Sequence, residues 1–403
     1  MRILIAYRYF SPDTPPYASM LEELTGWFAE AGHEVEMVTA QPAYKPSANI
    51  PKQPWREVRR GVNVRRLWLL RENGMGPAKV INSAVFVLRA FFIILLGPKR
   101  DLIWTATMPP VVQAWMLSFA ARMRGAKFLY HMQDLHPEIS AVSDGALKKG
   151  RLFNLMQRLD VKALSRSDVA VVLSPDMCNV LIERGVDPDT PRVIRNFALG
   201  DDAAEDLRAK RQMPAQGQPL SFCFAGNVGR FQNLEKLIEA FTKIDPSMAQ
   251  LVIVGEGRAK AELQAQVAAS GQSNVTFHDH MTESQVFAFL CKQHVGLVSL
   301  SPGLYRYAFP SKIWTYMAAD LPMLAMVEDE SYLHDFLCEY RLGTSLPWEA
   351  QADTLAATIT ALSRDVRNRN LRPAEHTQLY HKSAARAHWL TLMDELEKGS
   401  AHG

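Results

Sequence analysis

A lysine at a predicted helix start is the side chain of this sequence best suited to bind an anion. Phe309-Pro310-Ser311-Lys312 opens an apolar segment that ends near Ala319, and proline and serine are both common where helices begin. Backbone N–H groups and the helix dipole attract negative charge at such a start, and the Lys312 ammonium adds a full charge suited to phosphate. Taken alone, the tetrapeptide more often marks an ordinary capped helix with a solvated lysine.

Two glycine-rich turns follow predicted strands in the same half of the chain. Gly226-Asn227-Val228-Gly229-Arg230 comes after one apolar strand, and Val254-Gly255-Glu256-Gly257 comes after the next. Glycine lets backbone amides approach a ligand, an arginine can clamp a diphosphate, and a glutamate can accept hydrogen bonds from a ribose. Both turns are also compatible with simple strand–helix connections. The spacing differs from the G-x-G-x-x-G of dinucleotide-binding proteins, which weakens that interpretation.

The third candidate cluster lies in the N-terminal half, in Tyr130-His131-Met132-Gln133-Asp134-Leu135-His136-Pro137-Glu138. Its carboxylates and histidines follow a predicted strand and could supply a base or orient an acceptor hydroxyl. The alternative is a loop in which Asp134 and Pro137 only shape the turn. Metal binding is poorly supported, because Asp187-Pro188-Asp189 and His278-Asp279-His280 are better explained as structural.

The elements that must position these residues alternate between strand and helix patterns twice along the chain. Repeated strand–helix units predict parallel sheets with helices on both faces, hence an α/β protein with two doubly wound Rossmann-like domains that face across a cleft. We expect an N-terminal domain over 1–198, a polar linker over 199–218, a C-terminal domain over 219–375, and a helix within 376–403 that packs back on the N-terminal domain. The predicted strands are Arg2–Tyr7, Glu34–Thr39, Val62–Leu70, Asp101–Thr105, Lys127–Met132, Asp168–Leu173, Leu220–Ala225, Gln250–Val254, Asn274–His278, Val295–Leu300 and Pro322–Met326.

The distribution of charge along the sequence indicates what kind of partner the protein binds. The 403 residues carry a net charge of +3, yet the segment from Lys52 to Lys127 alone carries +11, with fourteen basic and three acidic residues. Such asymmetry indicates an anionic partner, either nucleic acid or an anionic membrane leaflet. Interleaved tryptophan and phenylalanine, and a nearly unbroken apolar run from Val80 to Leu96, favour the membrane. That run is short and charged for a transmembrane span, so we expect either an interfacial helix or a buried core helix.

Taken together, these motifs resemble the retaining glycosyltransferases of family 4, which have a two-Rossmann-domain (GT-B) fold. The resemblance extends to about residue 345 and is strongest to the bacterial O-antigen and capsule branch typified by L-fucosamine transferase. It rests on Tyr9-Phe10-Ser11-Pro12, Gly32-His33-Glu34-Val35, Gln133-Asp134-Leu135-His136-Pro137-Glu138, Leu173-Ser174-Pro175-Asp176-Met177, Arg195-Asn196-Phe197, Gly226-Asn227-Val228-Gly229, Val254-Gly255-Glu256-Gly257 and Pro310-Ser311-Lys312.

The resemblance implies an enzyme that transfers a sugar from a nucleotide donor to a lipid-linked, undecaprenyl-type glycan, with retention and without a metal or cofactor. It favours a UDP-sugar over a GDP-sugar. It places the protein on the cytoplasmic face of the plasma membrane, held peripherally through residues 52–127, with no nucleic acid as partner. The residues expected to be catalytic are Asp134, His136, Glu138, Arg230 and Lys312. Those expected to bind the donor are Gly226, Asn227, Gly229, Glu256, His280, Met281, Tyr307, Pro310, Ser311 and Thr315.

The sequence departs from the family pattern at several of these positions. The two glutamates that contact the donor in the wider family correspond to Tyr307 and Thr315, and its arginine–lysine diphosphate clamp falls on Asn227 and Gln232. Arg230 and Lys312 must then carry that charge. A catalytically degraded nucleotide-sugar-binding or scaffold protein therefore stays open as the alternative, as does an epimerase or phosphorylase with this fold.

Overall fold

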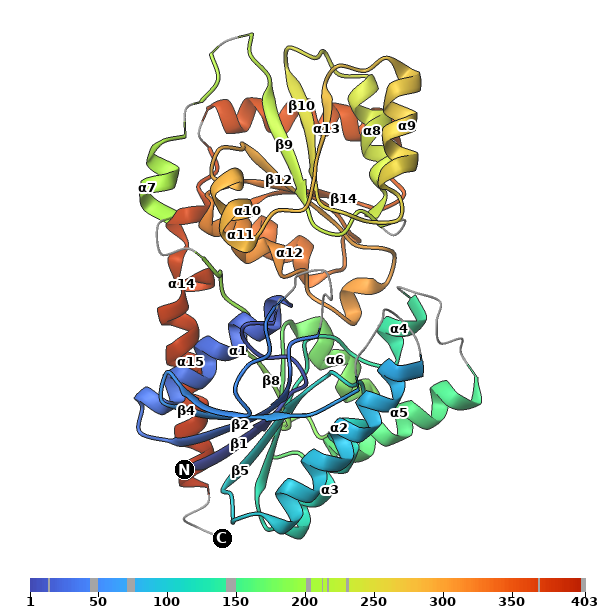
Figure 1. The fold of residues 1–403 in the computed structure, drawn as a ribbon. Coiled ribbons are helices and arrows are strands. Elements are labelled where there is room, and N and C mark those ends of the chain that lie inside the picture. The colour runs from blue at the N-terminus through green and yellow to red at the C-terminus, as the bar shows by residue number, and fades with distance from the viewer. Residues whose placement is uncertain are drawn as a thin grey trace. The chain divides into compact units, whose positions relative to one another are not determined.

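The computed structural model describes residues 1–13, 15–43, 50–70, 77–142, 150–200, 204–211, 213–215, 217–229, 232–368 and 370–399. The chain divides into two compact units, Met1–Ile194 with Ala385–Gly403, and Arg195–Ala384. Each unit contains a largely or wholly parallel sheet covered by helices, which confirms the predicted α/β class with two doubly wound domains (Figure 1).

The first unit contains an eight-stranded sheet in the order β3-β4-β2-β1-β5-β6-β7-β8, in which only β3 and β4 pair antiparallel. The strands are β1 (Arg2–Ala6), β2 (Glu34–Ala40), β3 (Arg56–Arg59), β4 (Val62–Leu67), β5 (Leu102–Ala106), β6 (Lys127–His131), β7 (Val169–Val172) and β8 (Pro191–Val193). The chain builds outward from β1 in one direction and then resumes at β5 in the other. Ligands of such sheets bind at the carboxyl ends of the strands, next to this reversal.

The helices of the first unit cover both faces of its sheet (Figure 1). These helices are α1 (Pro16–Glu30), α2 (Pro77–Leu96), α3 (Val112–Met123), α4 (Glu138–Val142), α5 (Arg151–Leu164), α6 (Pro175–Glu183) and the C-terminal α15 (Lys382–Lys398). Helices α1 and α15 lie on one side of the sheet, and α2, α3 and α5 lie on the other (Figure 1). The indole ring of Trp389 in α15 stacks on Trp104 of β5 with 4.9 Å between ring centroids, so the C-terminal helix completes the core of the first unit.

The second unit contains a six-stranded, wholly parallel sheet in the order β11-β10-β9-β12-β13-β14, which reverses between β9 and β12. Its strands are β9 (Leu220–Ala225), β10 (Ala249–Val254), β11 (Val275–His278), β12 (Val295–Ser299), β13 (Met323–Met326) and β14 (Gly343–Leu346). Its helices are α7 (Ala204–Ala209), α8 (Leu234–Thr242), α9 (Lys260–Ser270), α10 (Glu283–Leu290), η3 (Leu304–Arg306), α11 (Lys312–Ala318), α12 (Tyr332–Glu339), α13 (Ala352–Arg367), η4 (Pro373–Glu375) and α14 (Thr377–Tyr380). One apolar cluster joins the strands to α8, α9 and α13.

Two segments differ from the expectation drawn from the sequence. The stretch 199–218, expected to be a linker, contributes α7 to the second unit, and Arg211 beyond α7 pairs with Asp320 at 2.8 Å. Asp320 has φ +56°, a left-handed conformation usually taken by glycine, and its carboxylate also accepts from Ala374 N–H. The apolar run expected over Val80–Leu96 begins earlier, at Pro77, and α2 is long and apolar enough to span a membrane by length and composition.

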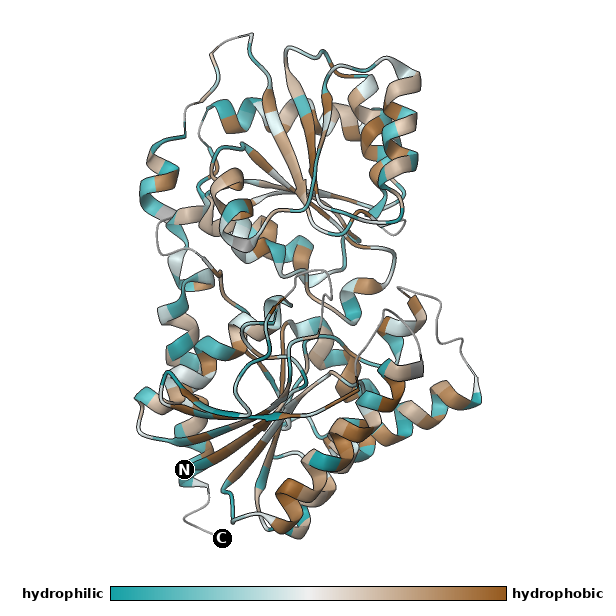
Figure 2. Cartoon of the chain, in the orientation of Figure 1, coloured by the Kyte–Doolittle hydropathy of each residue, from teal (hydrophilic) through white to brown (hydrophobic). Residues whose placement is uncertain are grey.

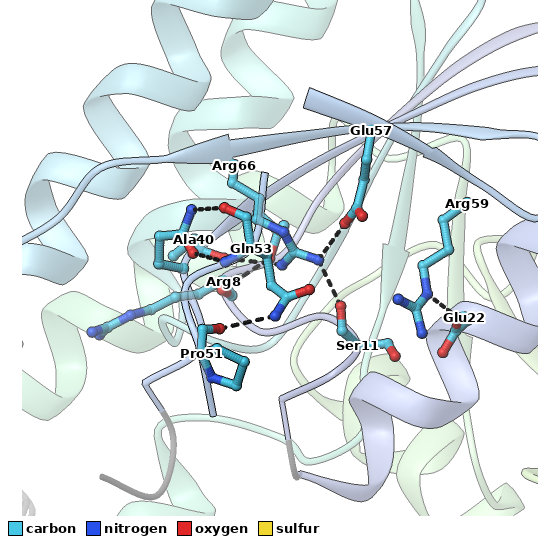
Figure 3. Close-up of polar contacts among 11 residues, drawn as sticks. Arg8, Ser11, Glu22, Ala40, Pro51, Gln53, Glu57, Arg59 and Arg66 are labelled. Carbon is cyan, nitrogen blue, oxygen red and sulfur yellow. Dashed lines mark hydrogen bonds and ion pairs between the residues drawn. The ribbon is translucent and has the colours of Figure 1, made fainter. Parts of the chain in front are cut away.

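The basic segment 52–127 is far less cationic in three dimensions than along the sequence. Arg66 is fully buried, where it donates to the carbonyl of Ser11 at 2.7 Å and pairs with Glu57 at 2.8 Å (Figure 3). Arg59 pairs with Glu22, Arg60 with Glu23, and Arg100 with Glu36, and these three glutamates lie outside the counted segment. The membrane surface predicted over residues 52–127 stays a prediction, with a smaller unpaired charge than the sequence count gives, because several of its arginines pair with glutamates of the same unit.

Candidate active site

The two glycine-rich turns of the second unit pack against each other by their backbones. The N–H of Val228 donates to the carbonyl of Glu256 at 2.9 Å, which continues the pairing of β9 and β10 beyond the strands. A Cβ on Gly255 would lie 1.9 Å from the Gly226 carbonyl oxygen, and one on Gly257 would lie 2.0 Å from the Val228 carbonyl oxygen. Glycine is thus required at both positions for this close approach.

Lys312 lies beside these turns with its ammonium unoccupied by any carboxylate of the described residues. Its Nζ atom is 3.9 Å from the ring centroid of Phe224, and a Cβ added to Gly226 would lie 3.3 Å from it. Burial lowers the pKa of Lys312 to about 8, although part of the side chain stays accessible. A cation that is desolvated, held over an aromatic ring and unpaired is a strong anion receptor.

The sequence pattern predicts the helix that carries Lys312 over Ser311–Ala319, and the structure starts it one residue later. Helix α11 begins at Lys312, and Ser311 at the capping position has helical backbone angles and makes no capping hydrogen bond, so the predicted serine cap is wrong. Tyr307 and Thr315, which replace the two glutamates of the family pattern, are partly exposed, and neither side chain has a hydrogen bond to a described residue. Both side chains are therefore available to a ligand. Pro310 directly precedes Ser311 and is also partly exposed.

Tyr316 is a positioning residue that sequence analysis missed. Its hydroxyl oxygen accepts from the N–H of Ala225 at 3.1 Å and lies 3.3 Å from the carbonyl of Leu297, which ties α11 to β9 and β12. The ring occupies space that only glycine leaves free, since a Cβ on Gly296 would lie 2.5 Å from it. The sequence pattern did not indicate this role for Tyr316, because its partners are backbone groups far away in sequence.

We expect Tyr316→Phe to lower turnover more than it lowers stability. Loss of the hydroxyl leaves the partly buried Ala225 N–H without this partner, which costs up to about 1–3 kcal/mol, and loosens the start of the helix that holds Lys312. Thermal unfolding and steady-state kinetics of the variant measure the two effects. A fall in stability with unchanged kcat would show that the hydroxyl contributes only to folding.

Glu256 and the residues after β11 form a second group at the same sheet edge. Lys260 donates to Glu256 Oε1 and to Asp279 Oδ1, each at 2.8 Å, and so joins the loops after β10 and β11. His280 and Met281 line an open groove together with His278, Phe289 and Lys292. Glu256 is thus half-neutralised, which leaves its second oxygen to accept from a ligand hydroxyl.

Three further predicted donor residues lie at the first turn. Gly226 and Asn227 are exposed, and Gly229 is partly buried. Arg230, predicted to share the diphosphate charge, lies outside the described residues.

The first unit brings its own predicted residues to the carboxyl end of β6. Asp134 is partly buried, and burial raises the pKa of its carboxyl to about 6, with no offsetting charge or hydrogen bond from the described residues. His136 is buried within 3.1 Å of the Ser140 hydroxyl, and burial, with Arg184 nearby, lowers the pKa of its ring to about 4. At neutral pH this places a carboxylate and an uncharged imidazole at one strand end.

Glu138 has a different environment from these two. Its carboxylate pairs with Arg184, the residue directly after α6, and accepts from Gln157 at 2.9 Å, and Arg184 also pairs with Asp160 at 2.9 Å. This buried ion-pair cluster holds the start of α4 against α5 and α6. These contacts are better explained if Glu138 positions the start of α4 than by the catalytic role predicted for it.

His131, the residue before this loop, is part of the core. Its Nδ1 lies 2.8 Å from the Tyr17 hydroxyl and its Nε2 lies 2.8 Å from the Gln133 amide nitrogen. Burial lowers the pKa of His131 to about 3, so a neutral ring satisfies both contacts. Trp389 of α15 packs edge-on against it with centroids 5.0 Å apart, which links the C-terminal helix to the loop that carries Asp134.

Comparison with known proteins places both units in one class of enzyme. Residues 17–196 match the model of the glycosyl transferase 4-like domain, and residues 219–365 match that of glycosyl transferases group 1. The chain is 24% identical over 396 residues to the putative colanic acid biosynthesis glycosyl transferase WcaI of Escherichia coli (strain K12), covering 94% of each chain.

Solved structures share the fold of the whole chain. Sucrose-phosphate synthase from Thermosynechococcus elongatus superposes with a TM-score of 0.72 at 18% identity, over 99% of this chain and 100% of that one. Anabaena Alr3699/HepE in complex with UDP-glucose superposes with a TM-score of 0.67 at 14% identity, over 98% and 100%. With a glycosyl transferase 4-like domain followed by a group 1 domain, the chain belongs to the glycosyltransferases of the two-domain GT-B type.

Proposed function

We propose that the protein transfers a sugar from a UDP-sugar to a lipid-linked glycan precursor in bacterial surface polysaccharide biosynthesis, at the cytoplasmic face of the plasma membrane. The single observation that supports it most is the unpaired Lys312 ammonium beside the glycine turns of the second unit. The name of the relative WcaI supports the pathway, and the UDP-glucose complex of HepE supports the donor class.

The chemistry proposed here is electrostatic. As the bond between sugar and diphosphate breaks, negative charge develops on the diphosphate, and Lys312 stabilises it without prior reorganisation. Asp134, ionised at neutral pH, accepts a hydrogen bond from the acceptor hydroxyl, and neutral His136 orients it. Retention of configuration and independence from metal are part of the proposal through the family resemblance.

A donor screen tests this function. Purified protein is incubated with a panel of UDP- and GDP-sugars and with membrane extract, and released nucleoside diphosphate is measured. We expect release from at least one UDP-sugar, dependent on the extract. No release from any donor, with or without extract, would contradict the proposal.

The replacement of two family glutamates by Tyr307 and Thr315 supports a second candidate, a nucleotide-sugar-binding protein with degraded catalysis. Calorimetry separates the two, since the second candidate binds UDP without any turnover of UDP-sugars.

The ribose contact gives a prediction of its own. Glu256 keeps one carboxylate oxygen free of Lys260, so we expect Glu256→Gln to weaken UDP binding, by about tenfold if a charge-assisted hydrogen bond to the ribose is lost. Thr315→Glu is expected to weaken binding as well if Glu256 already holds the ribose, because a second carboxylate would repel it. Tighter binding in Thr315→Glu with no change in Glu256→Gln would instead indicate an unfilled ribose site at α11.

A further inference from the structure

Three neighbouring helices of the first unit expose apolar side chains on their outer faces. In α2 these follow a helical stripe in which Phe92 is 51% and Leu96 is 78% exposed. Helix α3 packs beside α2, and α5 packs beside α3, so their exposed residues extend the same surface. The exposed apolar residues of this helix layer are Val80, Ile81, Leu88, Phe92, Leu96, Val112, Phe119, Met123, Leu152 and Leu155. Figure 2 shows the hydrophobic colouring along α2 and α3.

The opposite face of α2 belongs to the core. Phe86, Val87, Ala90 and Ile94 are buried, so this face of the helix packs into the core of the unit. A helix packed in this way lies along a surface. Its length and hydropathy, which would suit a membrane span, are better explained by an interfacial position.

The exposed charged residues of the helix layer, which consists of α2, α3 and α5, are all basic. Helices α2 and α3 contain no aspartate or glutamate, and the single one in α5, Asp160, is buried against Arg184. The exposed basic residues are Lys79, Arg89, Arg122, Arg151, Arg158 and Lys162. Apolar side chains interleaved with cations, without exposed carboxylates, match an anionic lipid surface.

A second copy of this chain is a poor match for the same surface. Pairing the layer with itself would bring cations against cations, with no exposed acidic residue in these three helices to compensate them. We therefore infer that the outer faces of α2, α3 and α5 bind the headgroup region of an anionic bilayer. This inference rests on the proposed function, whose acceptor is lipid-linked. It assigns the membrane-facing surface of the unit to these helices instead of the strands β3 and β4.

A contact at the start of α2 joins this surface to the candidate acceptor site. Arg8 follows β1 at the carboxyl edge of the sheet, and its Nη1 donates to Ser83 Oγ at 2.9 Å and to the Lys79 carbonyl at 3.4 Å, both in α2. The lipid-binding layer thus begins at the sheet edge where Asp134 lies. A lipid-linked acceptor held in the bilayer would present its glycan near that edge.

Vesicle sedimentation of the full chain tests the inference without donor or acceptor. With vesicles of phosphatidylcholine and phosphatidylglycerol, we expect Leu88→Gln/Phe92→Gln to lower the partition coefficient by about tenfold or more, because two exposed apolar side chains no longer enter the interface. Val58→Gln on β3 is the matched control, since Val58 is 72% exposed and lies outside the layer. Vesicle binding unchanged in the double variant, or equally reduced in Val58→Gln, would overturn the inference.

Charge variants test the second component of the surface. Arg122→Gln/Arg158→Gln is expected to lose about tenfold or more in binding to anionic vesicles at low salt and little at high salt, where the charges are screened. Arg59→Gln/Arg60→Gln is the control, because these arginines pair with Glu22 and Glu23, and it should bind like the wild type. If Arg59→Gln/Arg60→Gln weakened vesicle binding more than Arg122→Gln/Arg158→Gln did, the membrane-binding surface would lie at β3 and β4 instead.

Two further outcomes keep the inference separate from the proposed function. A chain that binds vesicles but transfers no sugar contradicts the proposed function alone. Self-association of the wild type, abolished by Leu88→Gln/Phe92→Gln while vesicle binding is absent in both, would show that a second copy covers the layer and would overturn the lipid assignment.

Discussion

Replacing Lys312 by alanine is expected to reduce kcat/KM for glycosyl transfer by about 10²–10³, the usual effect of removing one preorganised charge from a developing anion. The ammonium lies over Phe224 and beside Gly226, without a carboxylate partner among the described residues, so its charge is available to the diphosphate. Steady-state kinetics with the donor found in the screen measure the loss.

The fold should survive this substitution. Burial lowers the pKa of Lys312 to about 8, so the folded protein binds this proton less tightly than the unfolded chain does. The charged lysine therefore opposes folding below pH 8, and its cost fades as the pH rises toward 10.5. We expect the thermal midpoint of Lys312→Ala at pH 7 to equal or exceed that of the wild type. A lower midpoint together with the lost activity would assign Lys312 a structural role.

The same pKa predicts a pH dependence. The wild-type kcat/KM should fall as the pH rises through about 8, because the ammonium loses its proton. Lys312→Arg keeps its charge and should lose this alkaline limb, even at lower overall activity. Lys243→Ala provides the control, since Lys243 lies at the surface of the same unit and pairs with Asp353.

Sequence patterns predicted the sheets better than the side-chain partners. Strand-length apolar runs separated by helices were enough for two parallel sheets, because buried strands between helices follow from local hydrophobicity. The short strands β3, β8 and β14 were not predicted, since edge strands of three or four residues leave little periodic signal.

The net charge counted over a window of the sequence was the least reliable predictor of the membrane-binding surface. Arg59 and Glu22 are 37 residues apart in sequence and paired in space, and Arg66 is buried by contacts with three separate segments. A window of sequence contains the cations and leaves out the glutamates that neutralise them. The membrane surface could be located only once exposed and buried faces of α2, α3 and α5 were distinguished.

Within the candidate site, backbone geometry explains what the motifs could not. The sequence predicts anion-binding turns from the glycines after β9 and β10, and the structure shows that Gly255 and Gly257, after β10, are required for the close packing of the two turns. Helix α11 positions Lys312, and α11 is itself held in place by the Tyr316 hydroxyl and by the packing of the Tyr316 ring against Gly296. Such contacts join residues tens of positions apart, and no local pattern reports them.

Arg184→Met is the substitution expected to affect stability most. It removes the cation that Glu138 and Asp160 share in the core of the first unit, and breaking one partner out of a buried ion pair typically costs about 3–5 kcal/mol. Thermal and denaturant unfolding measure the loss. Arg192→Met, at an exposed arginine of β8 that donates to the backbone carbonyls of Asp189 and Pro191, is the control and should cost little.

The pH dependence of this loss distinguishes charge from packing. Burial raises the pKa of Asp160 to about 7, so the folded protein binds this proton more tightly than the unfolded chain, and the stability that it contributes is full below about pH 4 and lost as the pH rises toward 7. Without Arg184 the carboxyl of Asp160 is harder to ionise in the folded state, so the deficit of Arg184→Met should be largest near pH 8 and shrink toward pH 5. A deficit that is equal at both pH values would mean that Arg184 stabilises the unit by packing. Because the cluster also holds the start of α4, next to Asp134 and His136, residual activity of the variant at low temperature should show a raised KM for the acceptor rather than for the donor.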